Sequence, residues 1–286
     1  MAAPTLPASS AELAKALNHV VIGKWCDMAT IVVFFFECLI TMDMEVELVW
    51  KSKWTFTKAM YLINRYSTIT DIVVLYFHNY GTWVSACQAI YHLGIALYIV
   101  GIYLSESLLI LRVAVIWKAI GKQWIFVVGI LWAMYSAVMV YMLTSTFLLL
   151  RDVTFFTLLP FGGCLAQPKT TLWLDYCLLL IYDITMLAFM AYPTLKAFTV
   201  PYKPTGFVKH IHFEGLLFYV YLCLLDAICM VIQLTVPDDI FLFVMPGRII
   251  RSLLAGRVVL HIRDFVSRQA KGREGESGDV STIKFR

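Results

Sequence analysis

The residues most able to carry chemistry in this sequence are ionisable side chains inside long apolar runs. The acids are Glu37, Asp71, Glu106, Asp183 and Asp226, and the accompanying bases are Arg65, Arg112, Arg248, Arg251 and Arg257. A charged group in the middle of a bilayer costs at least about 2.5 kcal/mol, so such residues normally face a bundle interior and find partners. We expect buried ion pairs or the polar floor of a pocket, and a proton or ion path is the alternative.

The composition makes the lipid bilayer the main solvent of this chain. Of the 286 residues, 60% are hydrophobic and only 15% are charged, and the mean hydropathy is +0.78. A soluble globule of this size needs more polar surface than 23 Lys+Arg and 19 Asp+Glu can supply. The net charge of +4 does not indicate binding to nucleic acid, because the basic residues fall in short segments between apolar runs.

Seven apolar runs are long enough to cross a membrane, since a hydrocarbon core about 30 Å thick needs about 20 helical residues. They are Val21–Met42, Thr57–Asn79, Cys87–Trp117, Gln123–Leu149, Thr171–Thr194, Phe213–Val236 and Ile240–Ile262. The second and seventh contain charged residues, but only a helix satisfies the backbone of such runs in lipid. The predicted fold class is therefore an all-α integral membrane protein with a bundle of seven transmembrane helices.

The basic residues of the connecting segments predict the orientation. One side holds Lys51, Lys53, Lys58, Lys118, Lys122, Lys196, Lys203, Lys209 and the basic tail, whereas the other holds only Lys15, Lys24, Arg151 and Lys169. We expect the first side to be cytoplasmic, with the N-terminus outside and the C-terminus inside, in the plasma membrane or the secretory pathway. The chain then divides into an extracellular segment 1–19, a bundle 20–266 and a Gly-, Glu- and Ser-rich tail 267–286, predicted to be disordered.

Depth in the bilayer predicts which charged residues pair. Counted from the cytoplasmic edge at 1.5 Å per residue, Asp226 and Arg248 both lie about 20 Å deep, on consecutive helices. Glu37 and Arg65 both lie about 10 Å deep, also on consecutive helices. The sequence therefore predicts the ion pairs Asp226–Arg248 and Glu37–Arg65.

A third set of charges shares one level near the middle of the bilayer. Glu106, Asp183 and Arg251 all lie about 16 Å from the cytoplasmic edge, so Glu106 or Asp183 is available to Arg251. Arg112 lies nearer the inner end of the third run. That position makes it a candidate for coupling to a cytoplasmic partner.

Two of the seven cysteines are candidates for a disulfide. Cys87 is at the outer end of the third run and Cys164 is in the longest outer loop, both on the side expected to face an oxidising compartment. Cys26, near the outer end of the first run, is the competing partner. The alternative is that both thiols stay reduced, because geometry decides whether a bond forms.

Catalytic and metal-binding motifs are weak in this chain. The stretch 210–214 holds two histidines and a glutamate, but it lies in a basic inner loop without the spacing of a zinc motif. His78 and His92 lie near the outer ends of the second and third runs. They could hold zinc with Asp71 or Asp175, although polar lining of a pocket is the preferred interpretation. We expect no enzymatic activity, no metal and no cofactor.

The most distinctive stretch of the chain lies between residues 41 and 66. It runs Thr-Met-Asp-Met-Glu-Val-Glu-Leu-Val-Trp from Thr41, then Lys-Trp-Thr from Lys53, then Lys-Ala-Met-Tyr-Leu-Ile-Asn-Arg-Tyr from Lys58. This pattern resembles the N-terminal domain of unknown function in a large group of multi-pass membrane proteins from mushroom-type fungi. The resemblance is tight over about residues 20–80. It implies a seven-helix protein of receptor-like topology whose biochemical role is unassigned.

The topology, the basic inner loops and the position of Arg112 favour a receptor-like sensor. In this hypothesis an outer pocket binds a small ligand, and helix movement is read by a cytoplasmic signalling partner. The alternative is a solute transporter or channel, for which a kink at Pro246–Gly247 in the seventh run is the one sign. A lipid-acting membrane enzyme is a third class. The expected partners are the bilayer, a small molecule and a signalling protein, and not nucleic acid.

Overall fold

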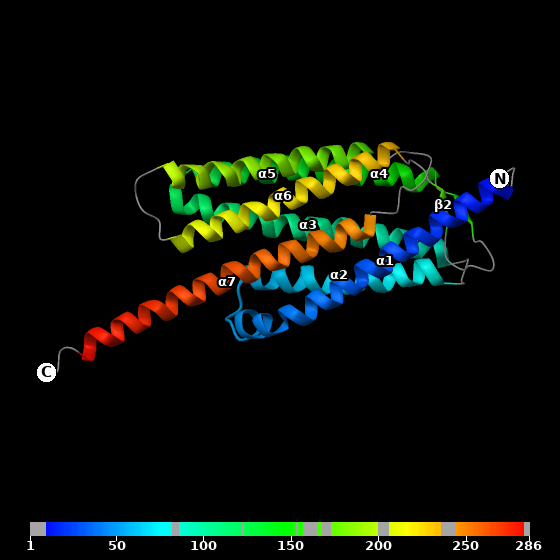
Figure 1. Ribbon diagram of the computed structural model, residues 1–286. Coiled ribbons are helices and arrows are strands. Elements are labelled where there is room, and N and C mark those ends of the chain that lie inside the picture. Colours follow the sequence, from blue (N-terminus) through cyan, green and yellow to red (C-terminus); the bar gives the residue numbers. More distant parts are fainter. Residues whose placement is uncertain are drawn as a thin grey trace.

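The computed structural model describes residues 10–81, 86–121, 123–152, 154–156, 165–167, 173–199, 206–235 and 244–282. Within these ranges the chain forms a bundle of long helices that run side by side (Figure 1). The helices are α1 Ser10–Glu45, α2 Phe56–Tyr80, α3 Cys87–Ile120, α4 Trp124–Asp152, α5 Trp173–Thr199, α6 Gly206–Thr235 and α7 Val244–Thr282. A π-helical turn, η1 (Val46–Trp50), extends α1, and strands β1 (Thr154–Phe156) and β2 (Leu165–Gln167) pair antiparallel.

Five of the helices are long and apolar enough to cross a membrane. They are α1 together with η1, α3, α4, α5 and α6. Their outward faces are apolar, as lipid contact requires, with Leu39 72% exposed and Phe126 72% exposed. Each of the seven predicted runs corresponds to one of the described helices, but α2 and α7, which carry several charged residues, are not among the five. The chain is thus a multi-pass, membrane-type helical protein.

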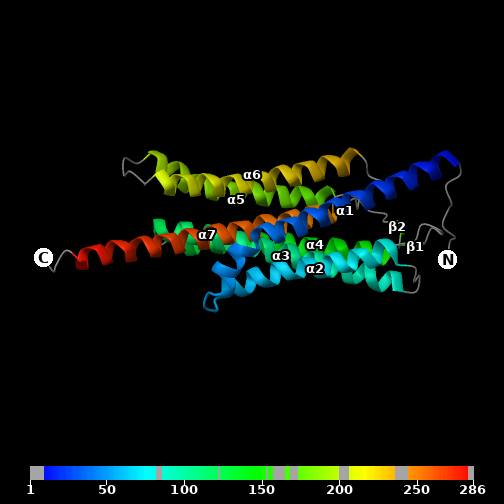
Figure 2. The ribbon, with the colours of Figure 1, turned by 60° about the horizontal axis from the view of Figure 1, so that its bottom comes forward.

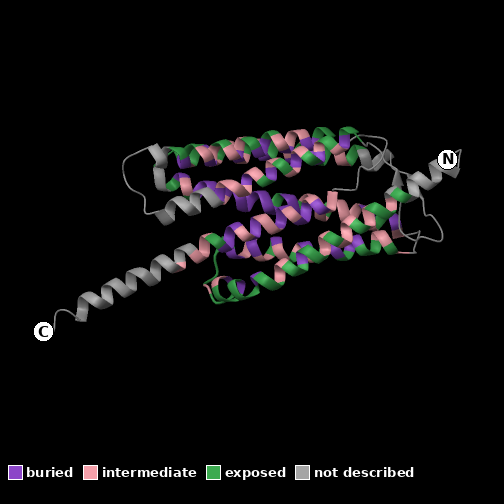
Figure 3. Ribbon diagram, in the orientation of Figure 1, coloured by how far each residue is buried: buried purple, intermediate pink, exposed green. Residues whose placement is uncertain are grey.

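Helices α3 and α7 form the centre of the bundle. Helix α3 packs against α2, α4, α5 and α7, and α7 packs against α1, α2, α3 and α6. Buried residues are concentrated along these two helices (Figure 3). On α3 the consecutive residues Leu108, Leu109 and Ile110 are at most 2% exposed. Helix α3 therefore contacts four neighbouring helices, although one part of its surface remains exposed, and it connects the two ends of the bundle.

A hydrogen-bonded turn connects η1 to α2. The side chain of Thr55 accepts a hydrogen bond from the backbone N–H of Lys58 at 3.3 Å, which satisfies one of the free donors at the start of α2. The Lys58 ammonium donates to the carbonyl oxygens of Trp50 at 3.1 Å and Ser52 at 2.8 Å. These bonds hold the α1–α2 hairpin closed.

The first and last helices extend beyond the predicted membrane-spanning runs. Helix α1 begins at Ser10, inside the segment 1–19 expected to precede the bundle. Helix α7 continues to Thr282 and projects from the bundle (Figure 2), so the segment from 267, predicted to be disordered, is helical to that residue. A helix that is already formed adds residues without a nucleation cost, which explains the difference.

Pro246 and Gly247 lie in the first turn of α7 and not in the middle of a helix. The first four N–H groups of a helix have no partner inside the helix, so a proline there removes no hydrogen bond. The predicted mid-helix kink is therefore wrong. The residues that follow, beginning with Arg248, continue as regular helix into the centre of the bundle.

Candidate functional site

A buried arginine on α7 gathers three carboxylates from three other helices. The Arg251 guanidinium contacts Glu106 of α3 and Asp226 of α6, and its Nη1 lies 3.1 Å from the Asp183 carboxylate of α5. All four residues are at most 3% exposed. We call these four residues the Arg251 cluster. It ties α3, α5, α6 and α7 together at one level of the bundle.

The sequence predicted part of the Arg251 cluster correctly. Glu106 and Asp183 were expected as alternative partners of Arg251, and the guanidinium contacts both. The predicted pair Asp226–Arg248 is wrong, because Asp226 contacts Arg251 instead. Depth along the bilayer normal shows which residues lie at the same level, but it does not show in which direction a side chain points. The partner of each arginine depends on the side of α7 from which it projects.

Arg248 faces α2 and is the second buried base of α7. Its Nη2 lies 3.4 Å from the Asp71 carboxylate, and it donates hydrogen bonds to Ser67 at 3.3 Å and Ser105 at 3.4 Å. The guanidinium lies directly against Gly101 of α3, where an added Cβ would overlap it. The absence of a side chain at position 101 therefore makes room for this ion pair.

A buried polar strip on α2 continues this contact toward the other end of the bundle. The Asn64 side chain accepts a hydrogen bond from Ser105 at 2.8 Å and donates to the Ser252 carbonyl at 3.4 Å. The hydroxyls of Thr68 and Ser252 are 2.8 Å apart. Buried polar groups of this kind need partners, and these bonds connect α2 to α3 and α7.

The predicted pair Glu37–Arg65 is also wrong. The Nε of Arg65 lies 2.8 Å from the Glu45 carboxylate, and the Glu37 carboxylate accepts hydrogen bonds from Arg257 at 2.9 and 2.5 Å. Helix α1 continues to Glu45, beyond the predicted end of its run, and so brings this acid to Arg65. Helix α1 also packs against α7, a neighbour that the order of elements does not reveal.

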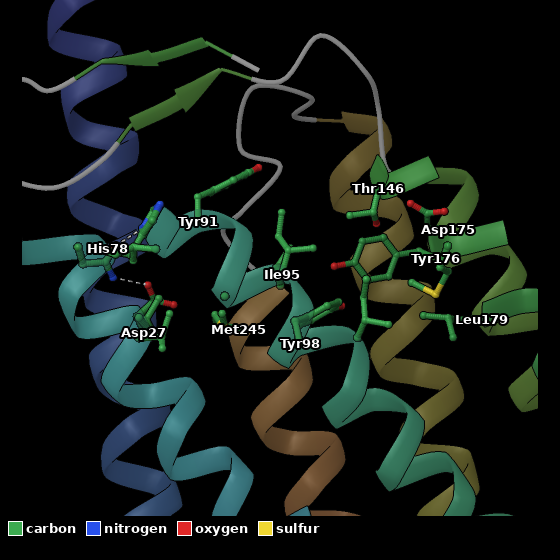
Figure 4. Close-up of a pocket in the computed structure, with 18 residues that line it drawn as sticks. Asp27, His78, Tyr91, Ile95, Tyr98, Thr146, Asp175, Tyr176, Leu179 and Met245 are labelled. Atoms are coloured by element: carbon green, nitrogen blue, oxygen red, sulfur yellow. Dashed lines mark hydrogen bonds between the residues drawn. The ribbon is translucent and has the colours of Figure 1, made fainter. Parts of the chain in front are cut away.

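A cavity of about 160 Å³ opens between the helices (Figure 4). It lies on the side of the Arg251 cluster that is nearer the start of α1, since its α3 residues precede Glu106 and its α7 residues precede Arg251. Its wall is largely apolar. The polar side chains in it are Asp27, His78, Asn79, Tyr91, Tyr98, Thr146, Asp175 and Tyr176. Asp27 and Asp175 lie on opposite sides of the cavity, with Ile95 and Tyr98 between them. A ligand in this cavity would therefore meet an acid at either end and apolar contacts between.

Each of the two cavity acids has a polar neighbour that orients it. The Asp27 carboxylate accepts a hydrogen bond from the Asn79 amide at 2.9 Å, and the Asp175 carboxylate accepts one from Ser145 at 3.1 Å. Convergent polar groups in an apolar cavity are typical of small-molecule sites. The expectation that His78 lines a pocket is consistent with its place in this wall.

Two tyrosines separate the cavity from the Arg251 cluster. Tyr98 and Tyr176 line the cavity and lie within hydrogen-bonding reach of each other. Tyr98 also lies close enough to Arg251 and Asp226 to interact with them electrostatically. The cavity and the charged cluster are therefore adjacent layers of one site. Sequence reasoning missed both tyrosines, since nothing in the order of residues distinguishes them from other core aromatics.

Arg112 lies further along α3, toward the opposite end of the bundle from the cavity. It is 5% exposed, its guanidinium carbon lies 6.0 Å from the centre of the Phe218 ring, and it fills the space beside Gly215 of α6. The sequence predicts a position near the inner end of a central helix. The structure adds that this arginine is buried against α6.

The cysteines and histidines fall into distinct settings. Cys87 is disulfide-bonded, whereas Cys26, Cys38, Cys177, Cys223 and Cys229 are free. The predicted partner Cys164 lies outside the described residues, so the Cys87–Cys164 bond stays a prediction. The side chains of 210–214 also lie outside the described part. Among the described residues, no group of three or more His, Cys, Asp or Glu side chains could hold a metal ion.

Comparison with known proteins adds one similarity. Residues 25–70 match a family of unknown function (DUF6533). The matched segment comprises most of α1, all of η1 and the first part of α2, including Glu37, Glu45 and Arg65. This agrees with the expectation of a domain of unknown function near the N-terminus. No match was found among curated proteins or among solved structures.

Proposed function

We propose that the protein is a receptor-like sensor that binds a small ligand in the cavity between Asp27 and Asp175. The observation that carries this proposal is the layering of the site. An accessible cavity on one side meets the Tyr98–Tyr176 pair, and behind that pair lies the buried Arg251 cluster. A cavity with a packed charged floor suits binding and signalling better than passage of a solute.

The proposed topology has seven crossings, with the N-terminus outside and the C-terminus in the cytoplasm. In this arrangement α7 crosses as an inner helix, and α2 crosses with its buried acid, Asp71, turned toward Arg248 of α7 and an apolar face exposed. The start of α1 and the end of α7 lie at opposite ends of the bundle, which fits an odd number of crossings (Figure 1). The basic residues of the connecting segments favour a cytoplasmic C-terminus, in the plasma membrane or the secretory pathway.

The cavity favours a small, mostly apolar ligand that donates hydrogen bonds. Its volume is about 160 Å³, its wall is apolar over most of its area, and its two acids are natural acceptors for such donors. Bound near Tyr98 and Ile95, the ligand would press on α3 (Figure 4). Catalysis is not part of this proposal.

Helix α3 is the element best placed to transmit binding. It lines the cavity at Tyr98, contributes Glu106 to the Arg251 cluster and carries Arg112, which packs against α6. A continuous helix moves largely as one body, so a shift at the cavity would change the α3–α6 contact about Arg112. The proposal is that a cytoplasmic signalling partner reads that change.

The test uses purified protein reconstituted in liposomes and a panel of small amines, alcohols and fatty acids. A ligand from the panel is expected to raise the unfolding temperature and to alter hydrogen exchange around Arg112, without any movement across the membrane beyond that seen in protein-free liposomes. Ile95→Trp, which fills the cavity, should abolish both responses. Leu93→Trp, on the 51% exposed outer face of the same helix, is the matched control and should preserve them. Uptake of a panel compound that is faster than its uptake into protein-free liposomes would overturn the proposal in favour of transport.

A further inference from the structure

The Arg251 cluster contains more acid than base. One guanidinium contacts three carboxylates, so with every group ionised the cluster has a net charge of +1 − 3 = −2. The neighbouring base, Arg248, has its own carboxylate, Asp71, at 3.4 Å and therefore adds no net positive charge. Uncompensated charge in a buried, weakly polarisable environment is normally removed by a change of protonation.

Two carboxylates of the cluster face each other. Asp183 and Asp226 lie within hydrogen-bonding reach of one another. Ionised carboxylates can only accept hydrogen bonds, so a bond between these two requires a proton on one of them. The Oδ2 atom of Asp226 is buried and has no hydrogen-bond partner among the described residues. A proton at that oxygen would give the pair the donor that it lacks.

Arg248 also interacts electrostatically with Arg251, but its charge is balanced by Asp71. Other described titratable side chains that interact with the cluster are the phenols of Tyr98 on α3, Tyr135 on α4, Tyr176 and Tyr182 on α5 and Tyr219 on α6, and the thiols of Cys223 and Cys229 on α6. A phenol or thiol is either neutral or negative. The excess acid must therefore be balanced within the cluster.

We propose that the Arg251 cluster is a proton-binding site in which Asp183 and Asp226 share one proton at neutral pH. The proton changes the net charge of the cluster from −2 to −1 and joins α5 to α6 by a carboxyl–carboxylate hydrogen bond. Its loss leaves two like charges in contact and weakens the packing of these helices. Tyr98 lines the cavity and interacts electrostatically with Arg251 and Asp226, so it is the described residue through which we propose that the cavity and the proton site are coupled.

This inference goes beyond the proposed sensing function and is independent of it. The charge balance concerns the protein without any ligand, so a cavity that binds nothing in the panel leaves the proton site untouched. The two tests fail separately, because one measures ligand responses at the cavity and the other measures a carboxyl group in the cluster.

The proton is measured by infrared spectroscopy of the full-length protein in lipid nanodiscs at neutral pH. Wild type is expected to show the C=O stretch of a protonated carboxyl group, which shifts when water is exchanged for D₂O. Asp183→Asn and Asp226→Asn each replace one carboxyl group by an amide. The amide N–H can donate a hydrogen bond to the remaining carboxylate, so that pair no longer needs a proton. Each variant is therefore expected to lose this band while keeping its helical circular dichroism.

Two control variants locate the proton. Glu37→Gln neutralises an acid paired with Arg257 outside the cluster and should leave the band unchanged. Asp175→Asn neutralises an acid of the cavity wall and should also leave it unchanged. A band that survives in both cluster variants, or that disappears in Asp175→Asn, would overturn the proposal.

If the cluster variants do not fold, the pH dependence of the carboxyl band in the wild-type protein tests the proposal. A carboxyl band that is present at neutral pH and disappears reversibly as the pH rises, together with a fall in the unfolding temperature, supports the proton site. A wild-type protein without such a band, across the pH range in which it stays folded, would overturn it.

Discussion

The guanidinium of Arg248 occupies the space that a side chain at position 101 would need. It lies against the Cα of Gly101, so even a methyl group there would overlap its nitrogen atoms. The arginine cannot simply move away, because its guanidinium is fully buried and engages Asp71, Ser67 and Ser105. Glycine at position 101 of α3 is thus a condition for the ion pair between α7 and α2.

Gly101→Ala should therefore destabilise the protein. Overpacking of a filled interior costs about 1–3 kcal/mol, and displacing the guanidinium also weakens a buried ion pair. Gly129→Ala is the matched control, because no atom of the described residues lies within 4 Å of a Cβ at that position of α4. In the control, the gain in helix propensity of about 0.5–1 kcal/mol should appear undiminished. Unfolding in mild detergent measures both, and equal effects of the two substitutions would contradict the crowding at Gly101.

Arg251 should be much less replaceable than Arg257, although the two lie on the same helix. Arg251→Met removes the one base among three buried carboxylates, and breaking a buried pair costs about 3–5 kcal/mol. Arg257→Met removes a base that contacts one carboxylate, that of Glu37, and the Arg257 side chain is 40% exposed, so this loss should cost less. The comparison is made by thermal unfolding and by the yield of monodisperse protein. Comparable losses in the two variants would argue against the Arg251 cluster as the central contact.

The helices were predictable from sequence, but most of the ion pairs were not. Apolar runs identified each helix, because lipid leaves the backbone no alternative to internal hydrogen bonding. The depth of each charged residue in the bilayer correctly predicted contacts of Arg251 with Glu106 and Asp183, which lie at the same depth. Depth in the bilayer did not predict the partner of Arg248, because that partner depends on which helix lies beside α7. Arg248 contacts Asp71 of α2. That neighbour relation comes from the packing of the whole bundle and leaves no mark in local spacing.

The Asp71–Arg248 pair should show coupling in a double-mutant cycle. Asp71→Asn leaves a buried guanidinium without its carboxylate, and Arg248→Met leaves a buried carboxylate without its base, so each should cost about 3–5 kcal/mol. The double variant should cost less than the sum of the two, with a coupling of about 0.5–3 kcal/mol. As a control, Asp71→Asn combined with Arg257→Met should be additive within about 0.5 kcal/mol, because those residues share no partner. If the changes in unfolding free energy are additive in both cycles, the ion pair between Asp71 and Arg248 does not contribute to stability.

The disulfide of Cys87 should be detectable by counting thiols. The free cysteines Cys26, Cys38, Cys177, Cys223 and Cys229 should react with a thiol reagent in the unfolded, unreduced protein, whereas Cys87 should not. If Cys164 is the partner, Cys164→Ser releases Cys87 and raises the number of reactive thiols by one. Loss of the bond should also lower stability by about 2–5 kcal/mol. Cys26→Ser, the matched control, should lower the thiol count by one with little change in unfolding temperature. A decrease in the thiol count for Cys164→Ser would show that Cys87 bonds elsewhere.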